Sequence, residues 1–72
     1  SEETIVRGRA PFTEAEERLL VRAVKQSAIY GYTEDGMRLY NTIAPQFPRH
    51  PPQALREHYL RVLRPRNLAR RS

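Results

Sequence analysis

The chain has 72 residues, of which 13 are lysine or arginine and 8 are aspartate or glutamate, giving a net charge of +5. A chain of this length forms one domain, buries only about 60% of the surface that its unfolded form exposes, and has no room for a deep catalytic pocket. It has no cysteine, two histidines, no membrane-length apolar run, no nucleophile–base pair and no glycine-rich phosphate loop, so we expect no disulfide, metal, cofactor, membrane span, small-molecule substrate or enzymatic activity.

The first nine residues show no periodicity and are predicted to form a flexible N-terminal arm, 1–9. Arg7 and Arg9 in this arm are either solvated terminal charges or contacts to a phosphate or a minor groove. The rest of the chain divides into a helical domain, 10–65, and a basic disordered tail, 66–72.

The first helix is predicted to begin after Thr13, which forms a T-x-x-E capping box with Glu16. It runs to about Ile29 or Tyr30, and Gly31 suits a C-terminal stop. Its acidic first turn is interpreted as a solvated face, with one i,i+4 pair between Glu14 and Arg18. The predicted buried stripe comprises Ala15, Leu19, Leu20, Ala23 and Val24.

A second helix is predicted over roughly Glu34–Ala44, after a loop at 31–36. Either Thr33 or Asp35 can cap it. One face carries the expected core residues Met37, Tyr40, Ile43 and Ala44, and Phe47 follows as a further core residue.

The third helix is predicted to begin at the prolines 51 and 52 and to end at Pro65. Its apolar stripe is Leu55, Tyr59, Val62 and Leu63, and its opposite face is Gln53, Arg56, Glu57, Leu60 and Arg64, with Arg61 at the edge. His50 is expected in the preceding turn as a helix cap, and His58 is expected to be partly buried and hydrogen-bonded. Arg61 either faces a partner or pairs with an acid of an earlier helix.

Positive charge is concentrated in the last third of the chain. Residues 49–72 hold seven arginines and one acid, giving +6, whereas residues 1–48 hold six basic and seven acidic side chains, giving −1. A basic face of this kind indicates a polyanionic partner, with nucleic acid as the first candidate. The alternative is that the arginine-rich tail aids solubility or carries a nuclear import signal.

Three helices with short connections predict an all-α three-helix bundle with a helix-turn-helix arrangement. The segments PFTEAEERLL, LYNTIAPQFP and QALREHYLRVL together resemble a Myb/SANT domain, in which each helix places one bulky aromatic side chain in the core. The resemblance implies that Phe12, Tyr40 and Tyr59 take these positions, where the family most often has tryptophan.

The segments at 56–65 and 11–13 are similar to the Myb domain of the repressor-activator telomere proteins. That resemblance implies a nuclear protein at chromosome ends, involved in silencing and end protection. Some family members bind double-stranded telomeric DNA through Myb domains, and others reach telomeres through telomere-binding protein partners. The DNA-binding residues expected here are Gln53, Arg56, Glu57, Leu60, Arg61, Arg64, Arg66, Arg70 and Arg71.

Overall fold

The computed structural model describes residues 10–71, and all the regular structure in this range is helical. The elements are α1 (Glu14–Ile29), α2 (Met37–Ile43), the 3₁₀ turn η2 (Ala44–Gln46), α3 (Pro52–His58), the π turn η3 (Tyr59–Leu63) and α4 (Arg64–Arg71). The last three follow one another without a break and form one long helix. The predicted all-α, three-helix arrangement is therefore confirmed over the described range, while the expected arm at 1–9 lies outside it.

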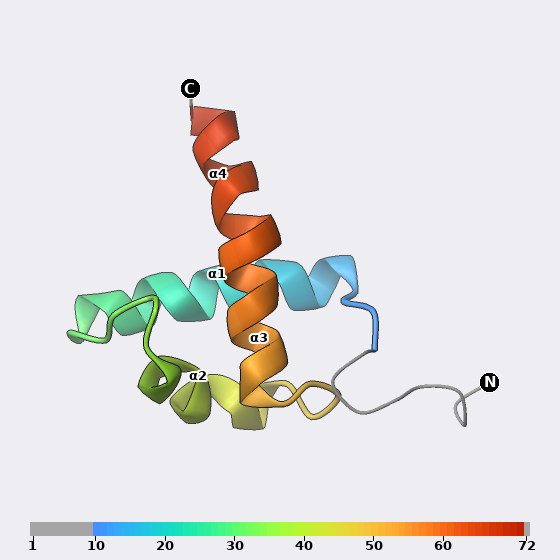
Figure 1. Cartoon of the computed structure of the whole chain (residues 1–72), viewed down its shortest axis with the longest axis vertical. Coiled ribbons are helices and arrows are strands. Elements are labelled where there is room, and N and C mark those ends of the chain that lie inside the picture. Colours follow the sequence, from blue (N-terminus) through green and yellow to red (C-terminus); the bar gives the residue numbers. More distant parts are fainter. Residues whose placement is uncertain (1–9, 72) are drawn as a thin grey trace.

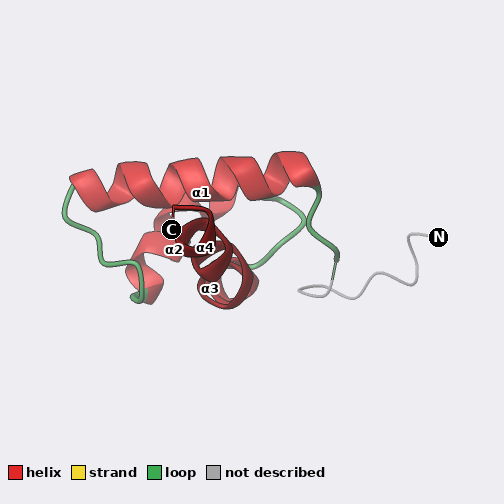
Figure 2. Ribbon diagram, turned by 90° about the horizontal axis from the view of Figure 1, so that it is seen from above, coloured by secondary structure: helices red, strands yellow, loops and turns green. Residues whose placement is uncertain are grey.

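The long third helix crosses the other two. Figure 1 shows α1 and α2 at different heights, with α3 running up from the level of α2 and α4 continuing past α1. Seen from above, α1 lies on one side of the molecule and α3 and α4 lie on the other (Figure 2). Backbone contacts join α2 to α3 and α1 to η3, while α4 contacts mainly the π turn below it. One side of α3 and most of α4 consequently lie outside the packed body.

The start and end of α1 are those that the sequence predicts. Thr13 N–H donates to Glu16 Oε1 at 2.9 Å, and Glu16 N–H donates to Thr13 Oγ1 at 3.0 Å, which completes the capping box. Beyond the last turn, Gly31 adopts φ +96°, a conformation that glycine tolerates better than other residues. Both ends of the helix are thus fixed by local sequence.

The buried stripe of α1 differs from the predicted one. Leu20, Ala23 and Val24 are buried, but Ala15 and Leu19 are exposed. The inward positions of the first two turns belong instead to Glu16 and Glu17, whose carboxylates meet partners from later in the chain. The interpretation of the acidic first turn as a solvated face was therefore wrong.

Helix α2 is shorter than predicted, because it begins at Met37 rather than near Glu34 and neither Thr33 nor Asp35 caps it. The carbonyls before it are held by side chains from elsewhere. Tyr40 Oη donates to Glu34 O at 2.7 Å, and Arg56 Nε donates to Asp35 O at 2.7 Å. These bonds keep the loop out of the helix.

The buried side of α2 also differs from the expected one. Leu39 is fully buried with Tyr40 and Ile43, whereas Met37 and Ala44 are only half-buried. The shorter helix places its second turn at the centre of the bundle. The core formed by all three helices contains Leu20, Ala23, Val24, Leu39, Tyr40, Ile43, Phe47, Leu55, Tyr59 and Leu63.

The third helix does not end at Pro65, and residues 66–71 are not a disordered tail. Helix α4 runs from Arg64 to Arg71 and includes the proline. Just before it, Arg64 N–H donates to Tyr59 O in the wide i→i+5 pattern of a π turn. Proline in an ordinary helix clashes with the carbonyl one turn earlier, and the wider turn relieves that clash. The helix therefore passes through a residue that usually stops one.

Candidate functional site

The outward face of α3 is narrower than the sequence suggests. Gln53, Glu57 and Arg61 are exposed at i, i+4 and i+8, opposite the buried Leu55 and Tyr59. We call these three residues the outward row. Arg61, expected at the edge of the polar face, lies in this row, and the structure gives it no acidic partner among the described residues. The row offers an amide, a carboxylate and a guanidinium to any partner.

Two of the expected DNA-binding arginines face the loop before α2 rather than open solvent. Arg64 Nη1 lies 3.3 Å from both Glu34 Oε1 and Asp35 Oδ1, and its side chain is 39% exposed. Arg56 is held by the Asp35 carbonyl described above. The hydrogen bond that Arg64 donates to Glu34 raises the pKa of Arg64. Both guanidiniums are therefore engaged in contacts within the fold, which makes them less available to a ligand.

The same acidic loop also contacts the core tyrosines. Tyr59 Oη donates to Glu34 Oε2 at 3.4 Å, and burial, followed by the charge of Glu34, raises the pKa of Tyr59. Burial likewise raises the pKa of Tyr40 far above its ordinary range. Tyr40 and Tyr59 lie inside the core cluster, and the phenols are neutral hydrogen-bond donors there.

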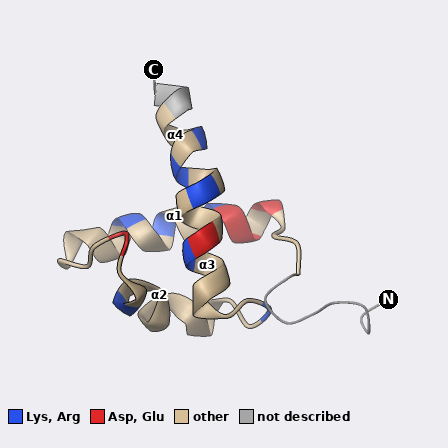
Figure 3. Cartoon of the chain, in the orientation of Figure 1, with Lys and Arg blue, Asp and Glu red and all other residues tan. Residues whose placement is uncertain are grey.

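Leu60 is half-buried and packs against the core cluster, so it offers little exposed surface to a ligand. Arg66, also expected on the DNA-binding surface, is 49% exposed, and its Nη1 lies 3.3 Å from Glu17 Oε1. Arg70 and Arg71 have their backbone in α4, but their side chains fall outside the described structure. In Figure 3, basic segments follow one another up the third helix, with an acidic one on α3.

A stack of three rings joins the start of α1 to the third helix. Phe12 lies between His50, at 3.8 Å between ring centroids, and His58, at 4.0 Å, with interplanar angles of 4° and 7°. His50 Nε2 lies 3.1 Å from Glu16 Oε1, and His58 Nε2 lies 2.8 Å from Glu17 Oε2. We call these five residues the histidine clamp. Phe12 is half-buried and packs against the core from this position.

The clamp corrects one expectation and confirms another. His50 does not cap α3, which has no side-chain cap; it is buried at 3% exposure and pairs with Glu16. Its Nδ1 has no hydrogen-bond partner in the structure. His58 is partly buried and hydrogen-bonded, as expected.

The histidines and neighbouring bases hold both clamp carboxylates in their ionised form. His58 lowers the pKa of Glu17 most strongly, against the opposing effect of burial, and Arg66 adds to the shift. Burial opposes the change at Glu16, but hydrogen bonds from Thr13 and His50 still lower the pKa of that group. Arg49 adds a weaker contact at 3.8 Å from Glu16 and donates to the Pro11 carbonyl.

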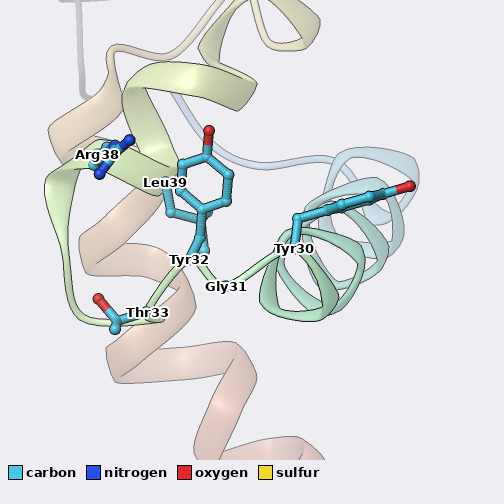
Figure 4. A pocket seen from close by; sticks show the side chains of 6 residues that line it. All are labelled: Tyr30, Gly31, Tyr32, Thr33, Arg38 and Leu39. Atoms are coloured by element: carbon cyan, nitrogen blue, oxygen red, sulfur yellow. The ribbon is translucent and has the colours of Figure 1, made fainter.

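A small pocket of about 260 Å³ lies at the junction of α1 and α2. Figure 4 shows its six lining residues, with the Tyr30 ring turned away from the Tyr32 ring. The Arg38 guanidinium carbon lies 5.6 Å from the centroid of the Tyr32 ring, a cation–π distance. The rings do not converge, so this pocket has no aromatic cage for a ligand cation.

Sequence reasoning missed the acids that organise the site. Glu34 was expected at the start of the second helix and Asp35 as one of its possible caps, yet they hold Arg56 and Arg64. The available signal was two adjacent acids in a loop, opposite a helix rich in arginine. Within residues 10–71, no group of three or more His, Cys, Asp or Glu side chains can hold a metal, and no helix is long and apolar enough to cross a membrane.

Comparison with known proteins gives one match. The family model described as the Rap1 Myb domain matches residues 12–69, which spans all the helices from α1 into α4. Neither the curated proteins nor the solved structures gave a significant match.

Proposed function

The chain belongs to the Rap1 Myb domain family, and on this premise we propose that it contacts duplex DNA through the outward row of α3 and the base of α4. The family is one of binding modules in telomere proteins and is not enzymatic. We further propose that the domain acts in the nucleus at chromosome ends, within a larger protein of telomere silencing and protection. Telomere-binding proteins are its other expected partners.

The observation that carries the proposal is the exposed guanidinium of Arg61. Arg61 is exposed on the third helix, and no acid among residues 10–71 pairs with it. Arg66 lies further along the same helix and is half exposed. In helix-turn-helix domains the corresponding helix enters the major groove, with its exposed side chains toward the bases.

Each member of the outward row has a different chemistry toward DNA. The Gln53 amide can bond adenine in a bidentate manner, and Arg61 can bond either guanine or a phosphate. The Glu57 carboxylate can accept from a cytosine amino group but repels the phosphates beside it. Specific contacts are therefore few, and binding rests mainly on phosphate neutralisation.

Because two arginines of the third helix already bond to the acidic loop, the expected affinity for DNA is lower than the number of arginines suggests. Arg56 and Arg64 must leave or share Asp35 and Glu34 to reach a phosphate. With about three phosphate contacts remaining, the slope of log affinity against log salt should be about −3. Binding of this kind is weak at physiological salt, so sequence specificity requires a second domain or a dimer.

The test is an amide chemical-shift titration with telomeric-repeat and scrambled duplexes at two salt concentrations. We expect shifts along α3 and the base of α4 with both duplexes. Arg61→Ala should weaken binding about tenfold and reduce the salt slope by about 1, since one phosphate contact is lost. Glu57→Gln should strengthen binding severalfold because it removes a carboxylate facing phosphate.

Arg38→Ala is the matched control, since it removes one exposed positive charge from α2, outside the outward row and the base of α4. It should leave the α3 shifts and the salt slope close to those of the unchanged chain. If Arg61→Ala and Arg38→Ala weaken binding equally, the contact is not localised on α3. The absence of any α3 shift at low salt would refute DNA binding by this face.

A second candidate function is protein binding by the outward row, without DNA binding. The observation that favours it is the exposed carboxylate of Glu57 at the centre of the row, while Arg56 and Arg64 of the same long helix are already engaged with the acidic loop. The titration with Glu57→Gln distinguishes DNA binding from protein binding by the outward row. A chain that gains no DNA affinity when this carboxylate is neutralised fits the protein-binding alternative.

A further inference from the structure

A second surface, separate from the outward row, lies between α1 and α4. It is a groove of about 680 Å³ where α4 rises past α1, and we call it the α1/α4 groove. Its lining residues are Glu14, Glu17, Arg18, Val21, Arg22, Lys25, Gln26, Ile29, Leu63, Arg66 and Asn67. The α1 members recur at three- and four-residue spacing, so they form one continuous stripe along the helix.

The floor of the groove is apolar. Leu63 is buried at 3% exposure beneath it, and Val21 is half-buried beside it. Ile29, at the end of α1, is 80% exposed and contributes nothing to the core. Together with Val21 and Leu63, Ile29 gives the groove an apolar strip that a partner can cover.

The rim of the groove is basic. Arg22 and Lys25 are exposed, and no acid among the described residues pairs with either. The acids of the groove, by contrast, are already engaged: Glu14 with Arg18, and Glu17 with His58 and Arg66. The unsatisfied charge of the rim is therefore positive and lies beside Val21 and Ile29.

We propose that the α1/α4 groove binds an acidic amphipathic helix of a protein partner. An apolar ridge of such a helix fits over Val21, Leu63 and Ile29, and its carboxylates face Arg22 and Lys25. The charge complementarity selects the occupant: an acidic helix gains at the rim, where a basic one is repelled. Helix α1 has 16 residues, so its full length accommodates about 24 Å of a helix lying along it.

Duplex DNA fits this groove less well than a peptide does. A DNA backbone gains nothing from the aliphatic floor of the groove. The outward row contributes no residue to the groove. Arg66 belongs to both proposals, because it lines the groove and lies at the base of α4, so variants of the outward row test DNA binding without changing the groove.

The experiment uses a synthetic helical peptide as the probe. The peptide has about 16 residues, with leucine at three- and four-residue spacing and glutamate on both flanks of the leucine stripe. A second peptide carries lysine in place of every glutamate. Amide spectra of the whole chain are recorded with each peptide, and separately with duplex DNA. We expect the acidic peptide to shift α1 amides from Val21 to Ile29 and those near Leu63, and the lysine peptide to shift none.

Two variants test the contacts without disturbing the core. Lys25→Glu reverses an exposed rim charge, and Ile29→Asn removes an exposed apolar side chain. Each should weaken binding of the acidic peptide about tenfold, through like-charge repulsion or lost apolar contact. Arg61→Glu is the matched control, because it reverses a charge on the outward row. It should abolish DNA shifts and leave peptide binding unchanged.

Four results would overturn the proposal. In the first, both peptides shift the same amides equally, so charge plays no part. In the second, the acidic peptide shifts the outward row instead of α1. In the third, duplex DNA displaces the peptide from α1, which makes the groove a nucleic-acid site. Concentration-dependent α1 shifts without peptide would identify a second copy of the chain as the occupant and would also refute the proposal.

Discussion

At the scale of single residues, Glu16 and Glu17 link parts of the chain that are far apart in sequence. Glu16 completes the cap of α1 and also meets His50, and Glu17 accepts from both His58 and Arg66. Adjacent residues of a helix point in directions about 100° apart. The two carboxylates can therefore grip different segments, the turn before α3 and the third helix itself. The sequence alone suggests that both side chains face solvent, but in the structure both hold distant segments together.

The first prediction concerns the pH dependence of Glu17. Because the folded chain lowers the pKa of this carboxyl group from its ordinary 4.5, its contribution to stability is complete above about pH 4.5 and is lost as the pH falls through the lower folded value. Glu17→Gln should lower the free energy of unfolding at pH 7 by about 1 kcal/mol. It should also flatten the acid limb of a stability curve measured by urea unfolding between pH 2 and pH 7.

The control for this experiment is Glu14→Gln. Glu14 lies in the same turn, but its side chain is 86% exposed and pairs only with the exposed Arg18. The substitution should leave the stability curve nearly unchanged, since exposed pairs contribute little. An acid limb as steep in Glu17→Gln as in the unchanged chain would contradict the assigned role of the clamp.

At the scale of elements, some helix boundaries are set by residues that are neighbours in sequence and others by long-range contacts. The capping box fixes the start of α1, and Gly31 fixes its end. The start of α2 depends instead on Tyr40 and Arg56, which hold the loop carbonyls before it. The third helix continues through Pro65 because the π turn beneath it accommodates the proline. An element boundary is predictable here only where the residues that set it are neighbours in sequence.

Gly31 provides a prediction about the junction of α1 and α2. A Cβ at this position meets no atom within 4 Å, so a substitution is opposed only by the backbone conformation at φ +96°. Gly31→Ala should therefore lower the free energy of unfolding by about 1 kcal/mol. Urea unfolding followed by helical circular dichroism measures this difference.

Gly36→Ala serves as the comparison at the other end of the same loop. Gly36 has φ −87°, and a Cβ there comes within 2.9 Å of the Thr33 hydroxyl, the end of a side chain that can rotate away. Its cost should be smaller than that at Gly31. Equal losses at the two glycines would indicate that φ at Gly31 does not set the conformation of the loop.

At the scale of the whole molecule, the uneven distribution of charge stabilises the fold. The long-range ion pairs of residues 10–71 all join an acid of α1 or of the loop after it to a base at or after Arg49. The basic last third of the chain is therefore partly neutralised by the acidic first part. What remains exposed is a smaller positive surface, divided between the outward row and the α1/α4 groove.

The sequence predicts the bundle well and its surfaces less well. Periodicity and caps identify α1 and the core positions of Leu55, Tyr59 and Leu63, because these depend on local pattern. It does not reveal that Arg64 pairs with Glu34, since the pairing follows from how α3 crosses the α1–α2 loop. An ion pair between side chains that are far apart in the chain leaves no periodic pattern in the sequence.

The burial of two tyrosines also determines how the chain absorbs ultraviolet light. The sequence has four tyrosines and no tryptophan, and Tyr40 and Tyr59 lie in the core with raised pKa values. Folding favours the neutral phenol, so these tyrosines contribute to the free energy of unfolding. The contribution is complete below about pH 10 and is lost as the pH rises through the pKa of the folded state. The tyrosinate absorbance of this pair should appear together with the loss of helical circular dichroism, so an alkaline titration reports unfolding without an added label. Ionisation of the pair in a chain that stays helical would contradict this assignment.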